Sequence, residues 1–402
     1  MRYQFGEFYL CSETFELRSS AGLVSIEPQV FNLLVHLLEH RDRVISKEEL
    51  IEAIWDGRFV SDWTVSSRIK SARKALGDDG RTQKYIKTVH GRGVRFIANV
   101  TSLANDESEA EVLVPAASSG ASEFVFQDIR FCHSQDGTKI AYAKAGEGQP
   151  LVKTANWLNH LEFDWQSPVW SHFFSDIMKG RTLFRYDARG NGLSDWDVSD
   201  FSFERQVEDL EAVVEATGLD RFPLFGISQG CAISVAYAAK YPERVTKLIL
   251  LGGYARGWRL SGSDKMLEEG EAMMTLIRSG WGRNNAAFRQ MFTTLFMPDA
   301  PSENKDWFNE LQRMTTSSEN AANLLDALGN VDVRPYLADV KATTLVVHCR
   351  GDVRVPLTAA QELAAGIPGA RFMTLESNNH LMPKSDPAWS KFSAAMTAFL
   401  SE

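Results

Sequence analysis

The sequence predicts an N-terminal α+β domain and a C-terminal α/β domain with a mostly parallel sheet. Over residues 1–100, an alternating pattern gives way to helical periodicity and then to a glycine-containing hairpin pattern. From residue 124 onward, short apolar strands alternate with helical segments, which is the order of a parallel sheet covered on both faces. Residues 101–123 between the two regions are small and acidic, and they predict a flexible linker.

The composition bounds the class of protein. The chain has 402 residues, of which 44% are hydrophobic and 24% charged, as is typical of globular domains with substantial cores. Its apolar runs are too short to cross a membrane, and its N-terminus lacks the apolar core of a signal peptide. The four cysteines and eight histidines show no metal-ligand or disulfide spacing. We therefore expect a cytoplasmic protein with no membrane partner, no metal and no cofactor.

The first hundred residues begin as short antiparallel strands and continue as helices. Alternating apolar residues predict the strands: Phe5, Phe8, Leu10, Phe15 and Leu17. One helix is expected over residues 28–41 and a second after Ser46. A third is expected from Ser61 or Asp62 to Leu76, where Gly77 ends it. Its apolar face consists of Val65, Ile69, Ala72 and Leu76.

The opposite face of this third helix carries hydroxyl and basic side chains, among them Ser66, Ser67, Lys70, Arg73 and Lys74. The chain has a net charge of −9, yet residues 61–95 hold nine Lys or Arg and three Asp or Glu. A basic patch on an acidic protein indicates a polyanionic partner for that patch, although a solvated charged face would give the same count.

Residues 85–97 predict a hairpin that turns at Gly91 and Gly93, with Arg92 and Arg95 at or beside its tip. The closing run TVHGRGVRFIA, with the strands and three helices before it, resembles the OmpR/PhoB-type winged-helix DNA-binding domain over residues 3–98. The resemblance implies that the third helix enters the major groove of double-stranded DNA. Ser66, Ser67, Lys70, Arg73 and Lys74 would then contact the DNA, and Arg92 and Arg95 would contact it from the wing.

Three residues of the second region follow predicted strands at positions suited to acyl transfer. Ser228, in Gly226-Ile-Ser-Gln-Gly230, lies between a strand over residues 222–227 and an alanine-rich helix. Asp352 follows a strand over residues 344–348, and His380 follows one over residues 371–375. A serine hydroxyl needs a neighbouring base, and the base needs an orienting carboxylate. We expect His380 to be the base and Asp352 its partner.

The order Ser, Asp, His and the run DARGNGLS over residues 187–194 resemble the α/β-hydrolase fold over residues 124–400. There the DARGNGLS run is mainly structural. The resemblance implies an oxyanion hole, with one donor from the amide of Gln229. The family's usual His-Gly pair is replaced by Ala155 and Asn156, so that Trp157 supplies the second candidate amide. Loss of one of the two donors would lower the rate by about 10²- to 10³-fold.

Residues 254–335 interrupt the strand alternation and predict a helical cap rich in Met and aromatic residues. Most of these residues would pack the cap onto the sheet, and a minority would line an apolar pocket. Such a pocket suits an uncharged ester, thioester, lactone or amide with a hydrophobic tail.

The three expected parts are a winged helix over residues 1–100, the linker, and a hydrolase domain over residues 124–402. No receiver domain precedes the winged helix, so we expect the hydrolase domain to receive the signal. The leading hypothesis is a one-component transcriptional regulator that senses a small molecule, with or without hydrolysing it. One alternative is a serine hydrolase that its N-terminal module tethers or regulates. Another is a DNA-binding protein whose second domain serves only for dimerisation. A homodimer is expected by analogy with winged helices of this type.

Overall fold

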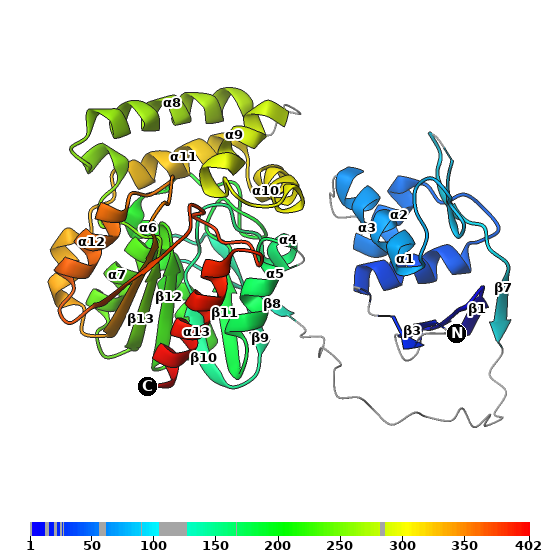
Figure 1. Ribbon diagram of the computed structural model, residues 1–402, viewed down its shortest axis with the longest axis horizontal. Coiled ribbons are helices and arrows are strands. Elements are labelled where there is room, and N and C mark those ends of the chain that lie inside the picture. The colour runs from blue at the N-terminus through cyan, green and yellow to red at the C-terminus, as the bar shows by residue number, and fades with distance from the viewer. Residues whose placement is uncertain are drawn as a thin grey trace. The chain divides into compact units, whose positions relative to one another are not determined.

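The computed structural model describes residues 2–12, 16–19, 22–24, 26, 28–55, 62–89, 91–103, 127–165, 167–281 and 286–402. The chain divides into two compact units, residues 1–120 and 121–402, and each is considered by itself (Figure 1). Residues 104–123 of the expected linker lie outside the described residues. Within the described ranges, no helix combines the length and the apolar character needed to cross a bilayer.

The first unit is an α+β domain with a five-stranded sheet, a three-helix core and a separate hairpin. The sheet has the order β4-β3-β2-β1-β7 and is antiparallel throughout. Its strands are β1 (Arg2–Phe5), β2 (Phe8–Cys11), β3 (Glu16–Ser19), β4 (Gly22–Leu23) and β7 (Val100–Leu103). Because β7 pairs with β1, the first unit extends three residues into the segment expected to be linker.

Three helices form the core of this unit: α1 (Pro28–Glu39), α2 (Lys47–Trp55) and α3 (Asp62–Ala75). The hydroxyl of Ser46 accepts the amide of Glu49 at 3.1 Å and so begins α2. The predicted apolar face of α3 is confirmed, since its four residues belong to one buried cluster with α1. Burial of that face fixes which side of α3 remains at the surface.

The hairpin consists of β5 (Ile86–Val89) and β6 (Gly93–Phe96). Gly93 has a φ of 131°, and a Cβ there would lie 1.9 Å from the carbonyl oxygen of Ile45. The backbones of Ile45 and Val94 form a bridge at this point. Only glycine allows the hairpin to approach the chain before α2 so closely.

The second unit is built on an eight-stranded sheet of order β15-β14-β13-β12-β10-β11-β9-β8. The six strands from β15 to β11 are parallel, and β9 and β8 are antiparallel at one edge. Their bounds are β8 (Gln127–His133), β9 (Lys139–Gly146), β10 (Gln149–Lys153), β11 (Arg181–Tyr186), β12 (Phe222–Ile227), β13 (Val245–Leu251), β14 (Thr343–Cys349) and β15 (Arg371–Leu375). The predicted mostly parallel sheet is confirmed.

Helices cover both faces of this sheet (Figure 1). On one face, α6 packs on α7, and the short helix η2 joins α7 to α12. On the other face, Phe173 of α5 stacks on Phe225 of β12, with ring centroids 5.6 Å apart, and Phe225 stacks on Phe392 of α13. The helices are α4 (Leu161–Trp165), α5 (Ser171–Ile177), α6 (Phe203–Thr217), α7 (Gly230–Lys240), η2 (Arg334–Asp339), α12 (Leu357–Gly366) and α13 (Pro387–Ser401).

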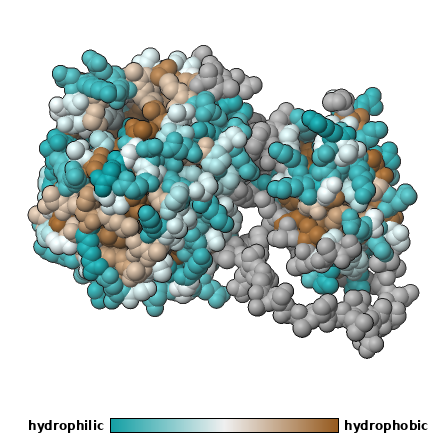
Figure 2. All heavy atoms as spheres, viewed as in Figure 1, coloured by the Kyte–Doolittle hydropathy of each residue, from teal (hydrophilic) through white to brown (hydrophobic). Residues whose placement is uncertain are grey.

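A helical layer lies over one end of the sheet, within the range where the sequence predicts a cap (Figure 1). It consists of η1 (Trp258–Leu260), α8 (Asp264–Gly280), α9 (Ala286–Phe296), α10 (Ser302–Thr315) and α11 (Ser318–Gly329). In this cap, α8 packs on α11 and α9 on α10. Figure 2 shows hydrophobic residues near α8 and α11, and others lower on the same face, among hydrophilic side chains.

Candidate active site and nucleic-acid interface

Ser228 occupies a strained turn between β12 and α7. Its φ is 53°, in the left-handed region that residues with a Cβ rarely adopt. The amide of Ser228 donates to the carbonyl of Leu251 at 2.9 Å, and its own carbonyl accepts from the amide of Cys231 at 3.0 Å. These bonds hold the hydroxyl-bearing residue at the carboxyl end of β12, where a parallel sheet presents its ligand site.

The two glycines of this turn are required by close backbone contacts. A Cβ at Gly226 would lie 2.7 Å from the carbonyl oxygen of Gly230. A Cβ at Gly230 would lie 2.7 Å from the carbonyl oxygen of Ala155, on the loop after β10. The Gly-x-Ser-x-Gly spacing therefore lets the turn tighten and lets the loop after β10 approach it.

His380 and Asp352 are brought together from the loops after β15 and β14. Nδ1 of His380 lies 2.6 Å from Oδ2 of Asp352, and both side chains are almost completely buried. The amides of Arg354 and Val355 donate to Oδ1 of Asp352 at 2.8 and 3.0 Å. The carboxylate is thus fixed by three hydrogen bonds and orients the imidazole so that Nε2 faces away from it.

The charge state of Asp352 follows from these partners. Burial by itself would raise the pKa of this carboxyl, but the charge and hydrogen bond of His380 and the amide of Val355 lower it below its ordinary value. A second histidine, His348, lies 3.7 Å from the same Oδ2, and its Nε2 is 2.9 Å from the carbonyl oxygen of Val355. Burial lowers the pKa of His348, which favours its neutral form. Asp352 therefore stays ionised.

The Ser228 hydroxyl and the His380 imidazole are not hydrogen-bonded to each other. Nε2 of His380 is buried and has no hydrogen-bond partner among the described residues. A Cβ at Gly252, the residue after the Ser228 amide's acceptor, would lie 3.1 Å from Cε1 of His380. The imidazole therefore lies against the same backbone segment that holds Ser228. Catalytic hydrogen bonds of this kind often tighten only when substrate is bound.

The two expected oxyanion donors, Gln229 and Trp157, line one cavity with Ser228. Neither backbone amide has a hydrogen-bond partner within the described part of the chain. The indole of Trp157 packs against Trp281, Phe292 and Phe296 of the cap at centroid distances of 5.7 to 6.0 Å. Two free amides beside a serine can stabilise a carbonyl oxygen as it becomes negatively charged.

This cavity encloses about 210 Å³ beneath the cap. The residues that line it are Trp157, Ser228, Gln229, Tyr254, Arg256, Trp258, Ser261, Met266, Phe296, Leu325, Leu328, Arg354, Val355, Pro356, Thr358, Ala359 and Glu362. Its wall includes apolar cap residues, as expected. It also includes three charged side chains that the sequence patterns had not indicated: Arg256, Arg354 and Glu362. The space suits a small molecule that enters between the cap and the sheet.

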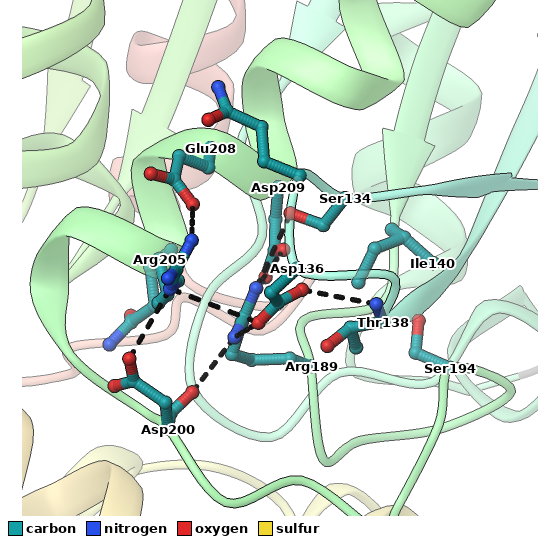
Figure 3. A network of polar contacts seen from close by, with 12 residues as sticks. Ser134, Asp136, Thr138, Ile140, Arg189, Ser194, Asp200, Arg205, Glu208 and Asp209 are labelled. Atoms are coloured by element: carbon teal, nitrogen blue, oxygen red, sulfur yellow. Dashed lines mark hydrogen bonds and ion pairs between the residues drawn. The ribbon is translucent and has the colours of Figure 1, made fainter.

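The DARGNGLS run contributes to structure. Arg189 is fully buried and donates to Asp209 at 2.8 and 2.6 Å and to Asp136 at 2.8 Å (Figure 3). It also donates to the carbonyl of Asp200. Figure 3 shows how this guanidinium ties the loop after β11 to α6 and to the β8–β9 turn. The buried charge of Arg189 is thus compensated by the carboxylates of Asp209 and Asp136, because a buried charge without such partners would be strongly destabilising.

In the first unit, three of the expected DNA contacts lie exposed on α3: Ser66, Lys70 and Lys74. The side chain of Ser67 is outside the described residues. Arg92 and Arg95 are exposed at the hairpin, where Nε of Arg95 donates to the carbonyl of Arg41 at 3.1 Å. Exposed cations on a helix and an adjacent hairpin form the kind of surface that contacts phosphates.

Arg73 differs from the expectation of a DNA contact. Its Nε and Nη2 donate to the carbonyl of Ile86 at 3.1 and 2.9 Å, and Nη2 also donates to the hydroxyl of Thr88 at 2.8 Å. The guanidinium therefore fastens β5 to α3. Helical periodicity placed Arg73 on the basic face, but it carried no information about the hairpin that packs beside that face.

Asp78 is a residue that the sequence patterns had not singled out. Its carboxylate accepts the amides of Lys84, Tyr85 and Ile86 at 2.7, 2.8 and 3.2 Å. Burial raises the pKa of this carboxyl, but these amides more than offset that effect and lower it. Asp78 thus anchors the start of the hairpin just after α3. Its position directly after the helix-ending Gly77 was the available signal.

One group of residues runs counter to the expectation that the histidines lack metal-ligand spacing. On α1, ligand atoms of His36, Glu39 and His40 lie within 4.8 Å of one another. Nε2 of His36 is 3.3 Å from Glu49, however, and Nδ1 of His40 is 3.0 Å from the carbonyl of His36. Both histidines already have a hydrogen-bond partner, and we assign no metal to them.

Comparison with known proteins identifies both domains. Residues 159–387 match the family model for the alpha/beta hydrolase fold, and residues 21–96 match that for the C-terminal domain of transcriptional regulatory proteins. The AB hydrolase superfamily protein YisY of Bacillus subtilis is 29% identical over 250 residues, which cover 58% of this chain and 86% of that protein. The 2-hydroxy-6-oxononadienedioate/2-hydroxy-6-oxononatrienedioate hydrolase of Escherichia coli is 31% identical over 221 residues, which cover 52% and 75%.

Solved structures show the same fold. An esterase from Exiguobacterium antarcticum superposes with a TM-score of 0.57 at 23% identity, covering 68% of this chain and 99% of the esterase. The enol-lactonase from Burkholderia xenovorans gives a TM-score of 0.56 at 22% identity, with 68% and 100% covered. The chain belongs to the alpha/beta hydrolase family and carries, at its N-terminal end, an OmpR/PhoB-type DNA-binding domain.

Proposed function

We propose that this chain is a transcriptional regulator that binds double-stranded DNA and whose hydrolase domain binds and hydrolyses a small ester, lactone or amide. One observation carries the proposal: a cavity lined by Ser228, close to the His380–Asp352 pair, lies in a chain that also has a DNA-binding domain. A small molecule that binds to one domain can change the DNA affinity of the other domain when both belong to the same chain.

In the proposed reaction, Ser228 Oγ attacks the substrate carbonyl while its proton passes to Nε2 of His380. The amides of Gln229 and Trp157 donate to the carbonyl oxygen as it becomes negative. Collapse of this intermediate breaks the bond to the leaving group, which takes the proton from His380. Water, deprotonated by His380, then cleaves the acyl-enzyme and regenerates Ser228. Asp352 stays ionised throughout and stabilises the imidazolium.

On the DNA side, the proposal rests on exposed Ser66, Lys70 and Lys74 of α3 and on Arg92 and Arg95 of the hairpin. We expect α3 to lie in the major groove and the hairpin to lie along the backbone. Ser67 remains part of the expected set, and Arg73 is left out because its guanidinium is engaged within the domain.

Two experiments on the full chain test the two halves. A chromogenic short-acyl ester assay compares the wild type with Ser228→Ala, and Ser390→Ala is the matched control because Ser390 is an exposed serine on α13. Equal hydrolysis by wild type and Ser228→Ala would exclude catalysis by Ser228. A binding assay with genomic fragments tests the other half, and it fails if binding shows neither sequence preference nor salt sensitivity.

The second candidate is a serine hydrolase that the DNA-binding domain only tethers. It is favoured by relatives named for their enzymatic activities, including a deacetylase from Xenorhabdus hominickii that is 26% identical over 254 residues, covering 62% of this chain and 90% of that protein. The two candidates differ in whether ligand binding changes the affinity for DNA. In a regulator, the DNA affinity of the Ser228→Ala variant changes when its cavity is saturated with ligand, whereas in a tethered enzyme it does not. Sedimentation in the same samples tests the expected homodimer and the reading in which the second domain only dimerises.

A further inference from the structure

One charged side chain on the cavity wall, that of Arg354, has no hydrogen-bond or ion-pair partner among the described residues. Arg256 and Glu362 pair with each other there, with Nε 3.2 Å from Oε2. The guanidinium of Arg354, in contrast, forms no hydrogen bond or ion pair with any described residue. It lies 5.8 Å from the ring centroid of Phe296, a cap residue on the same wall. The cavity therefore holds one positive charge that the described side chains leave uncompensated.

Arg354 is held close to the His380–Asp352 pair. Its backbone amide donates to Oδ1 of Asp352 at 2.8 Å. The ring of Phe296 lies 5.6 Å from the His380 ring, and the carbonyl of Phe296 accepts the His380 amide at 2.9 Å. The guanidinium thus faces Phe296, which contacts His380, and it lines the same cavity as Ser228.

A guanidinium presents parallel donors that match a carboxylate, and its charge is permanent. Much of the surrounding wall is apolar, with Trp258, Met266, Leu325 and Leu328 among its residues. A phosphate carries about −1.5 to −2 at neutral pH, whereas a carboxylate carries the single negative charge that matches one uncompensated arginine. We propose that the ligand carries one carboxylate, bound by Arg354, on an otherwise apolar body. This inference rests on the proposed function and departs from the expectation of an uncharged ligand.

The first test uses two substrates of matched length on the full chain. Mono-p-nitrophenyl glutarate ends in a carboxylate, and p-nitrophenyl valerate ends in a methyl group. We expect Arg354→Gln to lower the ratio of kcat/KM for the anionic ester over the neutral ester by about 10- to 100-fold, the usual effect of losing a charged hydrogen bond. Arg354→Lys should recover part of the ratio, because it keeps the charge but not the paired donors.

The control variant is Arg350→Gln, which removes the same charge from an exposed arginine paired with Glu376 outside this cavity. It should leave both rates unchanged. An unaltered ratio in Arg354→Gln, with hydrolysis still dependent on Ser228, would overturn the inference and leave the proposed hydrolase function standing.

The second test separates binding from turnover. Calorimetry measures the affinity of Ser228→Ala for monomethyl glutarate and for methyl valerate, with and without Arg354→Gln. We expect Ser228→Ala to bind monomethyl glutarate more tightly than methyl valerate. The added Arg354→Gln substitution should weaken the binding of monomethyl glutarate by about 10-fold or more. If the wild type hydrolyses neither ester, this binding result would still support the carboxylate site, and only the proposed catalysis would be overturned. Equal affinities in both variants would overturn the carboxylate site.

Discussion

The ammonium group of Lys153 lies 2.5 Å from Oδ1 of Asn156 and donates to it, inside the fold. It also donates to the carbonyl of Thr154 at 3.2 Å. Burial lowers the pKa of Lys153, although Asp164 nearby favours its charged form. Lys153 ends β10, and Asn156 directly precedes Trp157. The lysine therefore fixes the loop that carries the second proposed oxyanion donor.

Replacing Lys153 by Met is expected to lower kcat for a short-acyl ester by about 10- to 100-fold, because the Trp157 amide loses its fixed position. Stability should also fall, by about 1–3 kcal/mol, because Oδ1 of Asn156 and the carbonyl of Thr154 lose their buried donor. Steady-state kinetics and a urea unfolding curve on the same preparation measure both effects. A variant with normal kcat would show that Asn156 does not need this donor.

Gly252 limits the space beside the imidazole of His380, the proposed catalytic base. Its φ is 63°, and an added Cβ would lie 3.1 Å from Cε1 of His380. We expect Gly252→Ala to displace the ring and lower kcat by about 10- to 100-fold. Gly369→Ala is a matched control, because Gly369 has a φ of 70° and open space around its Cβ position. Comparable losses of activity in the two variants would assign the effect to backbone strain alone.

The mostly parallel sheet and the ends of its strands could be predicted because buried parallel strands are short apolar runs between helices. The bounds of β12 match the predicted range of residues 222–227 at both ends. The tight turn at Ser228 was indicated because glycines are needed on both sides of it. These features are determined by residues that are close in the sequence, so they can be predicted without knowledge of the tertiary structure.

Side-chain partnerships between distant segments could not be predicted. Arg73 pairs with the hairpin 13 and 15 residues away. Lys153 and Arg354 differ in whether they have partners, and nothing in the chain near either residue distinguishes them. The environment of each is set by tertiary packing, which periodicity does not encode.

His160 caps the N-terminus of α4 in its neutral form, so the stability of the hydrolase domain should depend on pH. Its Nδ1 accepts the amides of Glu162 and Phe163 at 3.2 and 3.3 Å and so caps α4. Burial, with a contribution from the Arg185 charge, lowers the pKa of His160 to about 4. Between this value and the ordinary value of 6.5, the unfolded chain binds a proton that the folded chain does not.

The stabilising contribution of neutral His160 is therefore complete above pH 6.5 and is lost as the pH falls toward 4. At most about 3 kcal/mol of unfolding free energy is at stake. His160→Asn keeps an acceptor at the helix start but does not titrate, so its stability should fall less over this range. Urea unfolding of both proteins at pH 7 and pH 4.5 measures the difference. Parallel losses in the two proteins would exclude His160 as the cause.

The proposed DNA-binding face of α3 carries two neighbouring cations, Lys74 and Arg73, with different environments. Lys74 is exposed, and no ion pair is found for it within the described ranges. Arg73 beside it holds the hairpin through Ile86 and Thr88. Removing the first should affect DNA affinity, and removing the second should affect the fold.

We expect Lys74→Ala to reduce the slope of log affinity against log salt by about 1, because one fewer phosphate is neutralised. Arg73→Met should instead destabilise the first unit by about 1–3 kcal/mol, because the Ile86 carbonyl loses its donors. Fluorescence anisotropy with a mixed-sequence duplex over a salt series measures the slope, and thermal melting measures the stability.

The control is Lys144→Ala, which removes an exposed lysine of the hydrolase domain and should leave both the slope and the stability unchanged. An unaltered slope in Lys74→Ala would remove that residue from the DNA interface, and an undiminished melting temperature in Arg73→Met would remove the anchoring role of Arg73.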